Sequence, residues 1–446
     1  MVLGIEGRSV VGNLRNVVSW SLWLAGLALF SVCDGTGLVL AQAPPAAVAV
    51  VHAPPRITED DEKKWNSTQQ IKFQNAQRAI APTNAETQVL TEGATHLVDR
   101  MTIPKYLPNL HRNVIARIRT AVEAAGTQPA SRAILLKTIN SRVAELLAEN
   151  PPHHPDVQLG LVLLLESLNS KVVVTPPSLV PATGSYKVLL SVLEDSNRPL
   201  QCRIHAASGV GRMGRDALVG VPGGDLSVVQ RNDIAASLAK VLVSSTVQGN
   251  EVGKVWFRCR VAKALGDCGV AFDLNGGSGF IDTLMITATN PAEHLRVRAA
   301  CLRATTQLSW NGTTNVPLIL HETAELLLEI AQGYNAALAA NKRLANADFQ
   351  HANMDIYLSF MPESAHQANI LKWGLLNQIT RPGLGQNGPA VTTAQAAAFP
   401  VIQHIISNPK TPVTIPAAQI AALDAWIKAN APKERKPTPV SPNAVP

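Results

Sequence analysis

The sequence predicts an all-α protein built from repeated pairs of helices. A segment that runs from Arg203 to Gly214 recurs from Arg258 to Gly269, and a shorter third copy begins at Arg296. Internal repeats of this size indicate stacked supersecondary units. Hydrophobic residues make up 46% of the chain but aromatic residues only 4%. The apolar mass is therefore aliphatic, which suits closely packed helices better than a β-sandwich.

The N-terminal part of this array is expected to be a helical region over residues 59–150. Thr83, Asn84 and Glu86 predict the start of one helix, which runs towards Met101. Apolar residues then recur at helical spacing in two longer segments, 109–125 and 131–149. Before this region, residues 44–58 are rich in Pro and Ala and predict a linker.

Residues 151–345 are expected to contain the repeats. Each unit is predicted to be a first helix, a turn and a second helix that opens with arginine. The three first helices are expected at residues 186–193, 226–243 and 280–289. Mid-helix alanines such as Ala207 and Ala262 would let each second helix approach its neighbours closely. Three prolines fill the connection that precedes the first unit: Pro176, Pro177 and Pro181.

The two clear copies resemble the second helix of a HEAT repeat. Arg203-Ile204-His205-Ala206-Ala207 closes in Val210-Gly211-Arg212-Met213-Gly214, and Arg258–Gly269 has the same pattern. The family pattern has a basic residue at the helix start, small residues in the middle and a closing Leu-Gly-like pair. The resemblance implies a HEAT-like α-α superhelix, an armadillo-like solenoid of the exported bacterial type, with helical N- and C-terminal extensions.

Beyond the repeats, residues 346–430 are expected to form a C-terminal helical region. One long helix is predicted through Ile319 towards Leu344, and a loop over residues 383–389. The last two helices are expected at residues 394–407 and 417–430. The tail, residues 431–446, contains five prolines without periodicity and is expected to be disordered.

The N-terminus has the pattern of an export signal. Arg8 and Arg15 precede an apolar run over residues 17–29, and Ala41-Gln42-Ala43 fits a cleavage site. We therefore expect residues 1–43 to be a signal peptide and the protein to be exported to the periplasm or cell envelope. Two alternatives remain open: an uncleaved membrane anchor through residues 17–40, and a lipoprotein anchored at Cys33.

Four cysteines follow the predicted signal peptide: Cys202, Cys259, Cys268 and Cys301. Cys259 and Cys268 lie on one predicted helix, roughly 13 Å apart, which is too far for a disulfide. Each cysteine lies among Ala, Val and Leu. We expect all four to be small buried hydrophobic residues.

The sequence contains no familiar catalytic or cofactor-binding motif in its expected structural context. The stretch Gly209–Gly214 has Gly-x-Gly-x-x-Gly spacing, but it falls inside a repeat helix without a preceding strand, so no dinucleotide site is expected. His321-Glu322 is not followed by the second His of a zinc-protease motif. The sequence therefore predicts no catalytic residue, no cofactor and no metal.

The leading hypothesis is a non-enzymatic scaffold that binds another protein through its extended surface. The candidate contact residues are the repeat arginines: Arg203, Arg258, Arg260, Arg296 and Arg298. In an alternative interpretation, Arg203, Arg258 and Arg296 cap turns and pair with carboxylates of neighbouring repeats.

Two other functions are alternatives to a protein scaffold. One is a solenoid that binds nucleic acid or another polyanion through the same arginines and the basic tail. The net charge of +7 without a basic stripe disfavours it. The other is a membrane-anchored enzyme with an unrecognised site around His351, Asp355 and His366. Contact with a membrane is expected only through an uncleaved N-terminal segment.

Overall fold

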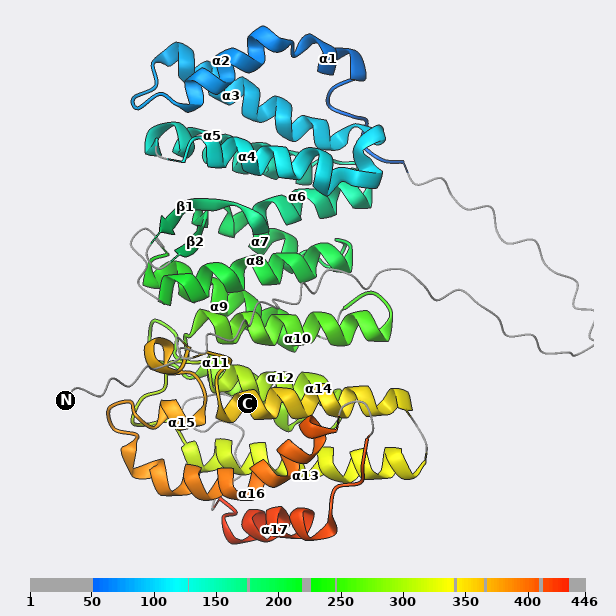
Figure 1. The fold of residues 1–446 in the computed structure, drawn as a ribbon, viewed down its shortest axis with the longest axis vertical. Coiled ribbons are helices and arrows are strands. Elements are labelled where there is room, and N and C mark those ends of the chain that lie inside the picture. Colours follow the sequence, from blue (N-terminus) through cyan, green and yellow to red (C-terminus); the bar gives the residue numbers. More distant parts are fainter. Residues whose placement is uncertain are drawn as a thin grey trace, which may run out of the picture. The chain divides into compact units, whose positions relative to one another are not determined.

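The computed structural model shows an all-helical chain with one two-stranded ribbon (Figure 1). It describes residues 51–126, 128–174, 177–218, 226–244, 247–340, 343–364, 367–408 and 412–432. The predicted signal peptide 1–43 lies outside these residues, as do positions 44–50 of the predicted linker and 433–446 of the predicted tail. Within the described ranges, no helix combines the length and the apolar character needed to cross a bilayer.

The first helices begin where side chains can cap them. The elements are α1 (Glu59–Lys64), α2 (Ser67–Gln77), α3 (Asn84–Asp99), α4 (Ala116–Ala124) and α5 (Pro129–Leu147). Thr83 and Glu86 form a capping box at the start of α3, in which each side chain accepts a hydrogen bond from the other residue's backbone N–H. This confirms the helix start predicted at Thr83. Two 3₁₀ turns and a π turn join α3 to α4: Arg100–Thr102, Pro104–Asn109 and His111–Ile115.

The described part of the predicted linker is attached to the helices. The backbone N–H of Ala53 donates to the Pro152 carbonyl at 3.1 Å, and the Arg56 guanidinium lies 2.5 Å from the Glu149 carboxylate. Arg56 also donates its backbone N–H to Thr102 Oγ1. Residues 51–58 form no helix or strand, and these contacts hold the segment against the turns that follow α5 and α3.

The middle of the chain contains the predicted helix pairs. The elements are α6 (Pro155–Ser167), α7 (Tyr186–Glu194), α8 (Leu200–Leu218), α9 (Val228–Val243), α10 (Glu251–Cys268), α11 (Gly279–Thr289) and α12 (Leu295–Thr305). The first helices expected before each copy are confirmed as α7, α9 and α11. The arginine start is right for α12, where Arg296 is the second residue. It is wrong for α10, which begins at Glu251, two turns before Arg258.

A short antiparallel ribbon stands where only a connection was expected. Strand β1 (Asn169–Val174) pairs with β2 (Pro177–Pro181), with Asn169 opposite Pro181. Proline donates no backbone hydrogen bond but is tolerated at strand ends and in edge strands. The prolines therefore bound this ribbon without preventing it.

Close helix packing in this region depends on residues without large side chains. Helix α8 packs on α6, α7 and α10, α10 packs on α12, and α12 packs on α14 (Arg343–Phe360). A Cβ atom on Gly211 of α8 would lie 2.9 Å from the Cα of Ala264 in α10. A Cβ atom on Gly266 of α10 would lie 2.8 Å from the Cα of Ala304 in α12. Backbones therefore approach directly at both interfaces.

Several mid-helix residues are buried, as the sequence predicts. Ala207 and Ala262 are fully buried in the shared hydrophobic core. Cys202, Cys268 and Cys301 are buried, Cys259 is half-buried, and none of these four forms a disulfide. The cysteine prediction is confirmed for three of them, and Cys259 is the partly exposed exception.

The C-terminal region adds α13 (Val316–Ala339), α14, α15 (Leu375–Gln378), α16 (Gly388–Ser407) and α17 (Ala417–Ala429), with a π turn at Gln367–Leu371 and a 3₁₀ turn at Gly385–Asn387. The predicted continuation of one helix to Leu344 is wrong, because α13 ends at Ala339. The predicted loop 383–389 is two residues too long, because α16 starts at Gly388. Pro389 fits the first turn of that helix, where no backbone N–H is needed.

One side chain joins this region to the repeats. Gln378 donates from Nε2 to the carbonyl oxygens of Thr306 and Leu308, at 2.9 and 2.6 Å. The backbone N–H of Gly374 also donates to the Thr306 carbonyl. These bonds satisfy the carbonyl groups of Thr306, the residue that caps α12, and of Leu308 in the turn that follows it. We call this set of contacts the Gln378 clasp.

Candidate functional site

Two short basic stripes meet between α10 and α12, so the expectation that the chain has no basic stripe is wrong for these helices. Trp256, Arg260 and Lys263 are spaced by four and three residues on α10, so they share one face of that helix. Arg296 and Arg303 are seven residues apart on α12 and share a face in the same way. These five residues border a cavity of about 150 Å³, which we call the basic cleft. Its remaining walls come from four further residues: Cys259, Ala300, Gln307 and Asp355.

The carboxylates near the basic cleft neutralise only part of its charge. Arg303 pairs with Asp355 of α14 at 2.9 Å and also with Glu363, and Arg296 lies 3.6 Å from Asp348. Within the described ranges, Arg260 and Lys263 form no ion pair with a carboxylate. The cleft therefore has an excess of positive charge at the α10 stripe.

The electrostatics of Lys263 reflect this excess. Burial lowers the pKa of Lys263, and the positive charges of Arg303 and Arg260 lower it further, while Asp267 and Glu363 act to raise it. An anion bound in the cleft would oppose these effects because it would interact favourably with the protonated amine.

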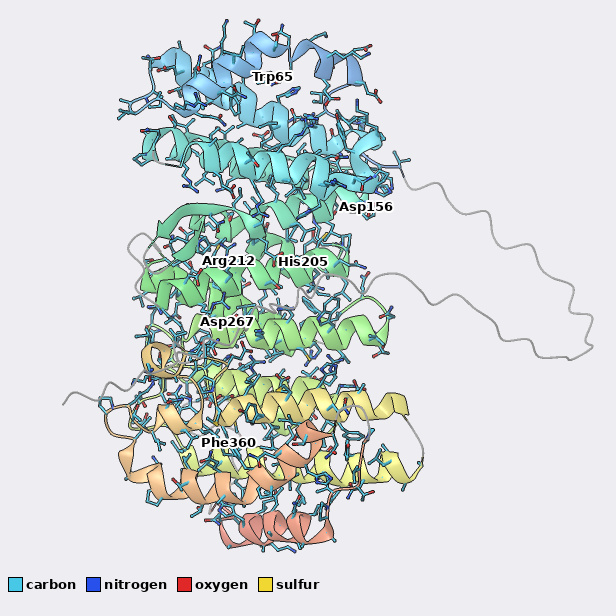
Figure 2. All side chains as sticks on the ribbon, in the orientation of Figure 1. Trp65, Asp156, His205, Arg212, Asp267 and Phe360 are labelled. Atoms are coloured by element: carbon cyan, nitrogen blue, oxygen red, sulfur yellow. The ribbon has the colours of Figure 1, made fainter. Side chains whose placement is uncertain are left out.

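A buried carboxyl group lies one helical turn beyond Lys263. Asp267 is only 6% exposed and lies within the helices, where Figure 2 marks it. Burial raises its pKa to about 6, although Arg215 of α8, Lys263, Arg303 and Arg260 all act to lower it. The carboxyl group of Asp267 is therefore held beneath the basic cleft at a cost in free energy when it is ionised.

The mouth of the cleft has an exposed aromatic side chain. Trp256 is 52% exposed, although tryptophan is usually largely covered in folded proteins. Exposed tryptophan next to arginine is the composition typical of binding hot spots. The cleft thus combines an apolar anchor with two cations, Arg260 and Lys263, that form no ion pair within the part of the chain that the structure describes.

The predicted contact arginines separate into two groups. Arg260 and Arg296 line the basic cleft. Arg203 is 3% exposed, donates from Nε to the Leu193 carbonyl and stacks over Phe257 at 4.6 Å. Arg258 pairs with Glu293, and Arg298 pairs with Glu329 at 2.8 Å. Partners inside the fold favour the structural interpretation for Arg203 and Arg258, and Arg296, which that interpretation also included, lies 3.6 Å from Asp348. Arg298 was not part of that interpretation but is paired as well.

Sequence reasoning missed Trp256, Lys263 and Arg303. Their signal was the spacing of Arg260 to Lys263 and of Arg296 to Arg303, which places each pair on one helical face. The repeated segments instead indicate the first arginine of each copy as a candidate contact residue. Of those first arginines, Arg203 and Arg258 donate to the carbonyl oxygens of Leu193 and Ser244, at the ends of α7 and α9.

Of the suggested enzyme site around His351, Asp355 and His366, the structure describes the first two residues. The Asp355 carboxylate pairs with Arg303 in the basic cleft, and His351 is exposed on α14. His366 lies outside the described residues. The Gly-x-Gly-x-x-Gly stretch 209–214 lies inside α8, as the sequence predicts.

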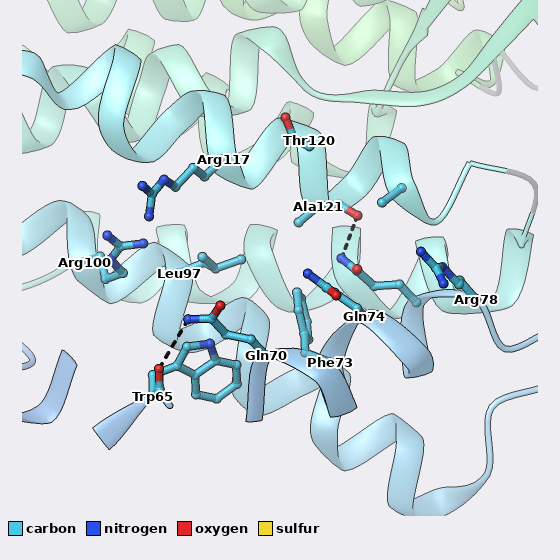
Figure 3. A pocket seen from close by; sticks show the side chains of 12 residues that line it. Trp65, Gln70, Phe73, Gln74, Arg78, Leu97, Arg100, Arg117, Thr120 and Ala121 are labelled. Carbon is cyan, nitrogen blue, oxygen red and sulfur yellow. Dashed lines mark hydrogen bonds between the residues drawn. The ribbon is translucent and has the colours of Figure 1, made fainter. Parts of the chain in front are cut away.

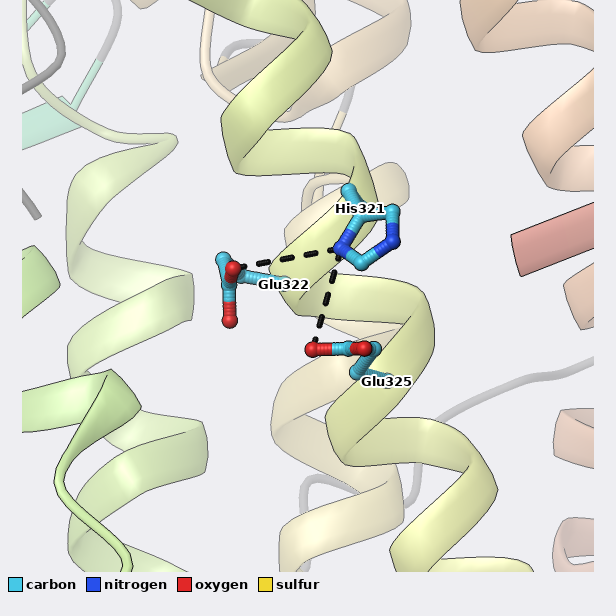
Figure 4. A group of neighbouring side chains, drawn as sticks. All are labelled: His321, Glu322 and Glu325. Carbon is cyan, nitrogen blue, oxygen red and sulfur yellow. Dashed lines mark ion pairs between the residues drawn. The ribbon is translucent and has the colours of Figure 1, made fainter. Parts of the chain in front are cut away.

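A second cluster could provide metal ligands. His321, Glu322 and Glu325 of α13 offer three donor atoms that all lie within 4.8 Å of one another (Figure 4). His321 Nδ1 is 3.8 Å from Glu322 and 3.7 Å from Glu325. Imidazole and carboxylate ligands suit a divalent transition metal, but ion pairing along one helix also explains the arrangement.

This chain matches no family model, no curated protein and no solved structure. The resemblance to HEAT repeats therefore remains a prediction based on the repeated segments.

Proposed function

We propose that the protein is a non-enzymatic binding scaffold, a HEAT-like solenoid whose basic cleft holds an acidic segment of a partner protein. The proposal rests on Arg260 and Lys263, which share one face of α10 and have no ion pair among the described residues. Complementary charge speeds association and excludes wrong partners, while Trp256 supplies apolar area at the rim. An acidic protein segment would place carboxylates against the α10 stripe and a side chain against the indole ring.

The test compares the full-length protein with a charge-reversed variant, Arg260→Glu/Lys263→Glu. We expect the unmodified protein to bind a fluorescein-labelled hexaglutamate peptide in fluorescence anisotropy, and the variant to bind it at least about tenfold more weakly. Arg112→Glu/Lys137→Glu is the matched control, because both side chains are exposed on other helical segments and the change in net charge is the same. This control should keep the affinity within about twofold of the unmodified protein.

Two results would contradict the proposal. Equal affinity of the cleft variant and the unmodified protein would show that the peptide binds elsewhere. Tighter binding of an equally labelled DNA duplex, lost in the same variant and falling steeply with added salt, would favour a nucleic-acid or polyanion binder.

We further propose that the scaffold is exported and acts in the periplasm or cell envelope. The basic, apolar and Ala-Gln-Ala segments of residues 1–43 support this proposal. Mass spectrometry of the N-terminus, on protein purified from its native cell, should find a chain that starts near Ala43. An intact Met1 would contradict cleaved export and would favour the uncleaved anchor.

A further inference from the structure

A separate pocket lies at the N-terminal end of the described chain, among α2, α3 and α4. It encloses about 370 Å³, within the usual range for sites that bind small molecules. Figure 3 shows the side chains around it. It shares no residue with the basic cleft. We call it the Trp65 pocket.

One wall of the Trp65 pocket is aromatic and fixed in place. The indole ring of Trp65 stacks on His96 at 4.7 Å and meets the edge of Phe73 at 6.2 Å. Phe73 is itself held against Gly93, where a Cβ atom would come within 2.3 Å of its ring. A flat apolar ligand can therefore bind this wall without first ordering it, and such preorganisation favours affinity.

The polar side of the pocket is cationic. Arg78, Arg100 and Arg117 line it, and none of its described lining residues is acidic. In Figure 3 the guanidinium groups of Arg100 and Arg117 lie at the same end of the pocket. Two guanidinium groups at one end suit a carboxylate or a phosphate, because each guanidinium can donate two N–H hydrogen bonds to such an anion.

The two arginines at that end differ in their present contacts. Arg100 is buried, pairs with Glu62 at 2.7 Å and bonds to the Tyr106 hydroxyl, which sets its orientation. Its Nε–H is buried, and no described residue accepts a hydrogen bond from it. Arg117 is exposed and has no ion pair within the described ranges. An anion from solution would supply Arg117 with the partner that the chain does not.

The third wall ties the helices together. Gln77 donates from Nε2 to the Ala121 carbonyl at 2.9 Å and so joins α2 to α4. Gln70 and Gln74 add amide groups along the same edge of α2. These groups offer hydrogen bonds without adding charge, so they help to orient a ligand and leave the positive potential of the arginines intact.

We propose that the Trp65 pocket binds a small organic anion that carries one carboxylate or phosphate group on a flat apolar body. The acidic group lies against Arg117 and Arg100, and the apolar body lies against Trp65 and Phe73. This site is independent of the proposed scaffold function, because it is formed by different helices.

The test uses 2-naphthoate as the probe and 2-naphthamide as its neutral match, titrated into the full-length protein by calorimetry. We expect one saturable site that binds the acid at least about tenfold more tightly than the amide. Arg117→Gln should reduce the affinity for the acid at least about fivefold and leave the affinity for the amide unchanged. Arg112→Gln removes a nearby exposed arginine outside the pocket and should change neither affinity.

A second variant checks the aromatic wall. Trp65→Ala should weaken the acid and the amide together, with the circular dichroism spectrum confirming that the helices remain. The proposal is overturned by equal affinity for acid and amide, by an unchanged affinity in Arg117→Gln, or by no saturable binding up to about 5 mM. Because neither Arg117 nor Trp65 belongs to the basic cleft, loss of hexaglutamate binding is a separate result.

Discussion

Gly211→Ala is expected to lower the free energy of unfolding by about 2 kcal/mol, even though alanine favours a helix over glycine by roughly 1 kcal/mol. The added methyl group would lie 2.9 Å from the Cα and from the Cβ of Ala264. Backbone atoms cannot rotate away as a flexible side chain can, so α8 and α10 must move apart. Urea unfolding followed by circular dichroism measures the loss.

The matched control is Gly279→Ala at the start of α11. A Cβ atom there would meet no other atom within 4 Å. This variant should be as stable as the unmodified protein or more stable by up to about 1 kcal/mol, because only the gain in helix propensity remains. If Gly211→Ala stabilised the protein as much as Gly279→Ala, direct backbone contact between α8 and α10 would be refuted.

Asp267→Asn is expected to remove a pH-dependent cost to stability. In the unfolded chain this carboxyl group has its ordinary pKa of 3.8, and burial raises the pKa in the folded protein to about 6. The folded state therefore binds the proton more tightly, so its stability falls as the pH rises from about 4 through 6. The difference between the two pKa values corresponds to about 3 kcal/mol.

The measurement is the difference in unfolding free energy between Asp267→Asn and the unmodified protein, at pH 4 and at pH 7. Asparagine does not titrate, so this difference should shift in favour of the variant by about 2 kcal/mol between the two values, because part of the cost is already present at pH 4. Asp233→Asn, at an exposed position of α9, is the control for loss of an aspartate and should shift by less than about 0.5 kcal/mol. A shift for Asp267→Asn as small as that of the control would contradict the buried ionised state.

Local signals in the sequence predict most of the helices but not all of their ends. Thr83 with Glu86 marks a helix start because capping needs only residues three positions apart. The start of α10 at Glu251 was not predicted, because the repeated segment begins only at Arg258. The ribbon β1–β2 was missed because the prolines around it indicate a connection, and strand pairing depends on residues beyond each local window.

The candidate site could be predicted only in part for a related reason. Arg260 and Arg296 were identified because the repeats contain them. Arg203 and Arg258 have the same sequence signal, yet Leu193 and Glu293 bind them within the fold. Only the packing of α10 on α12 shows which arginines line a cavity and which are held inside the fold. No sequence pattern predicts the Trp65 pocket, because its walls come from segments that are separate in the sequence.

The Gln378 clasp implies an order of events while the chain is being synthesised. Neighbouring helices such as α7 and α8, or α11 and α12, pack on each other and can associate soon after they leave the ribosome. Thr306 and Gln378 are 72 positions apart, so the carbonyl groups after α12 gain these partners only once a much later segment has been synthesised. Until that segment emerges, the carbonyl groups of Thr306 and Leu308 bind water, and the edge of the repeats stays open. A chain that stops before Gln378 would keep folded helices in its middle but leave this edge exposed to other proteins.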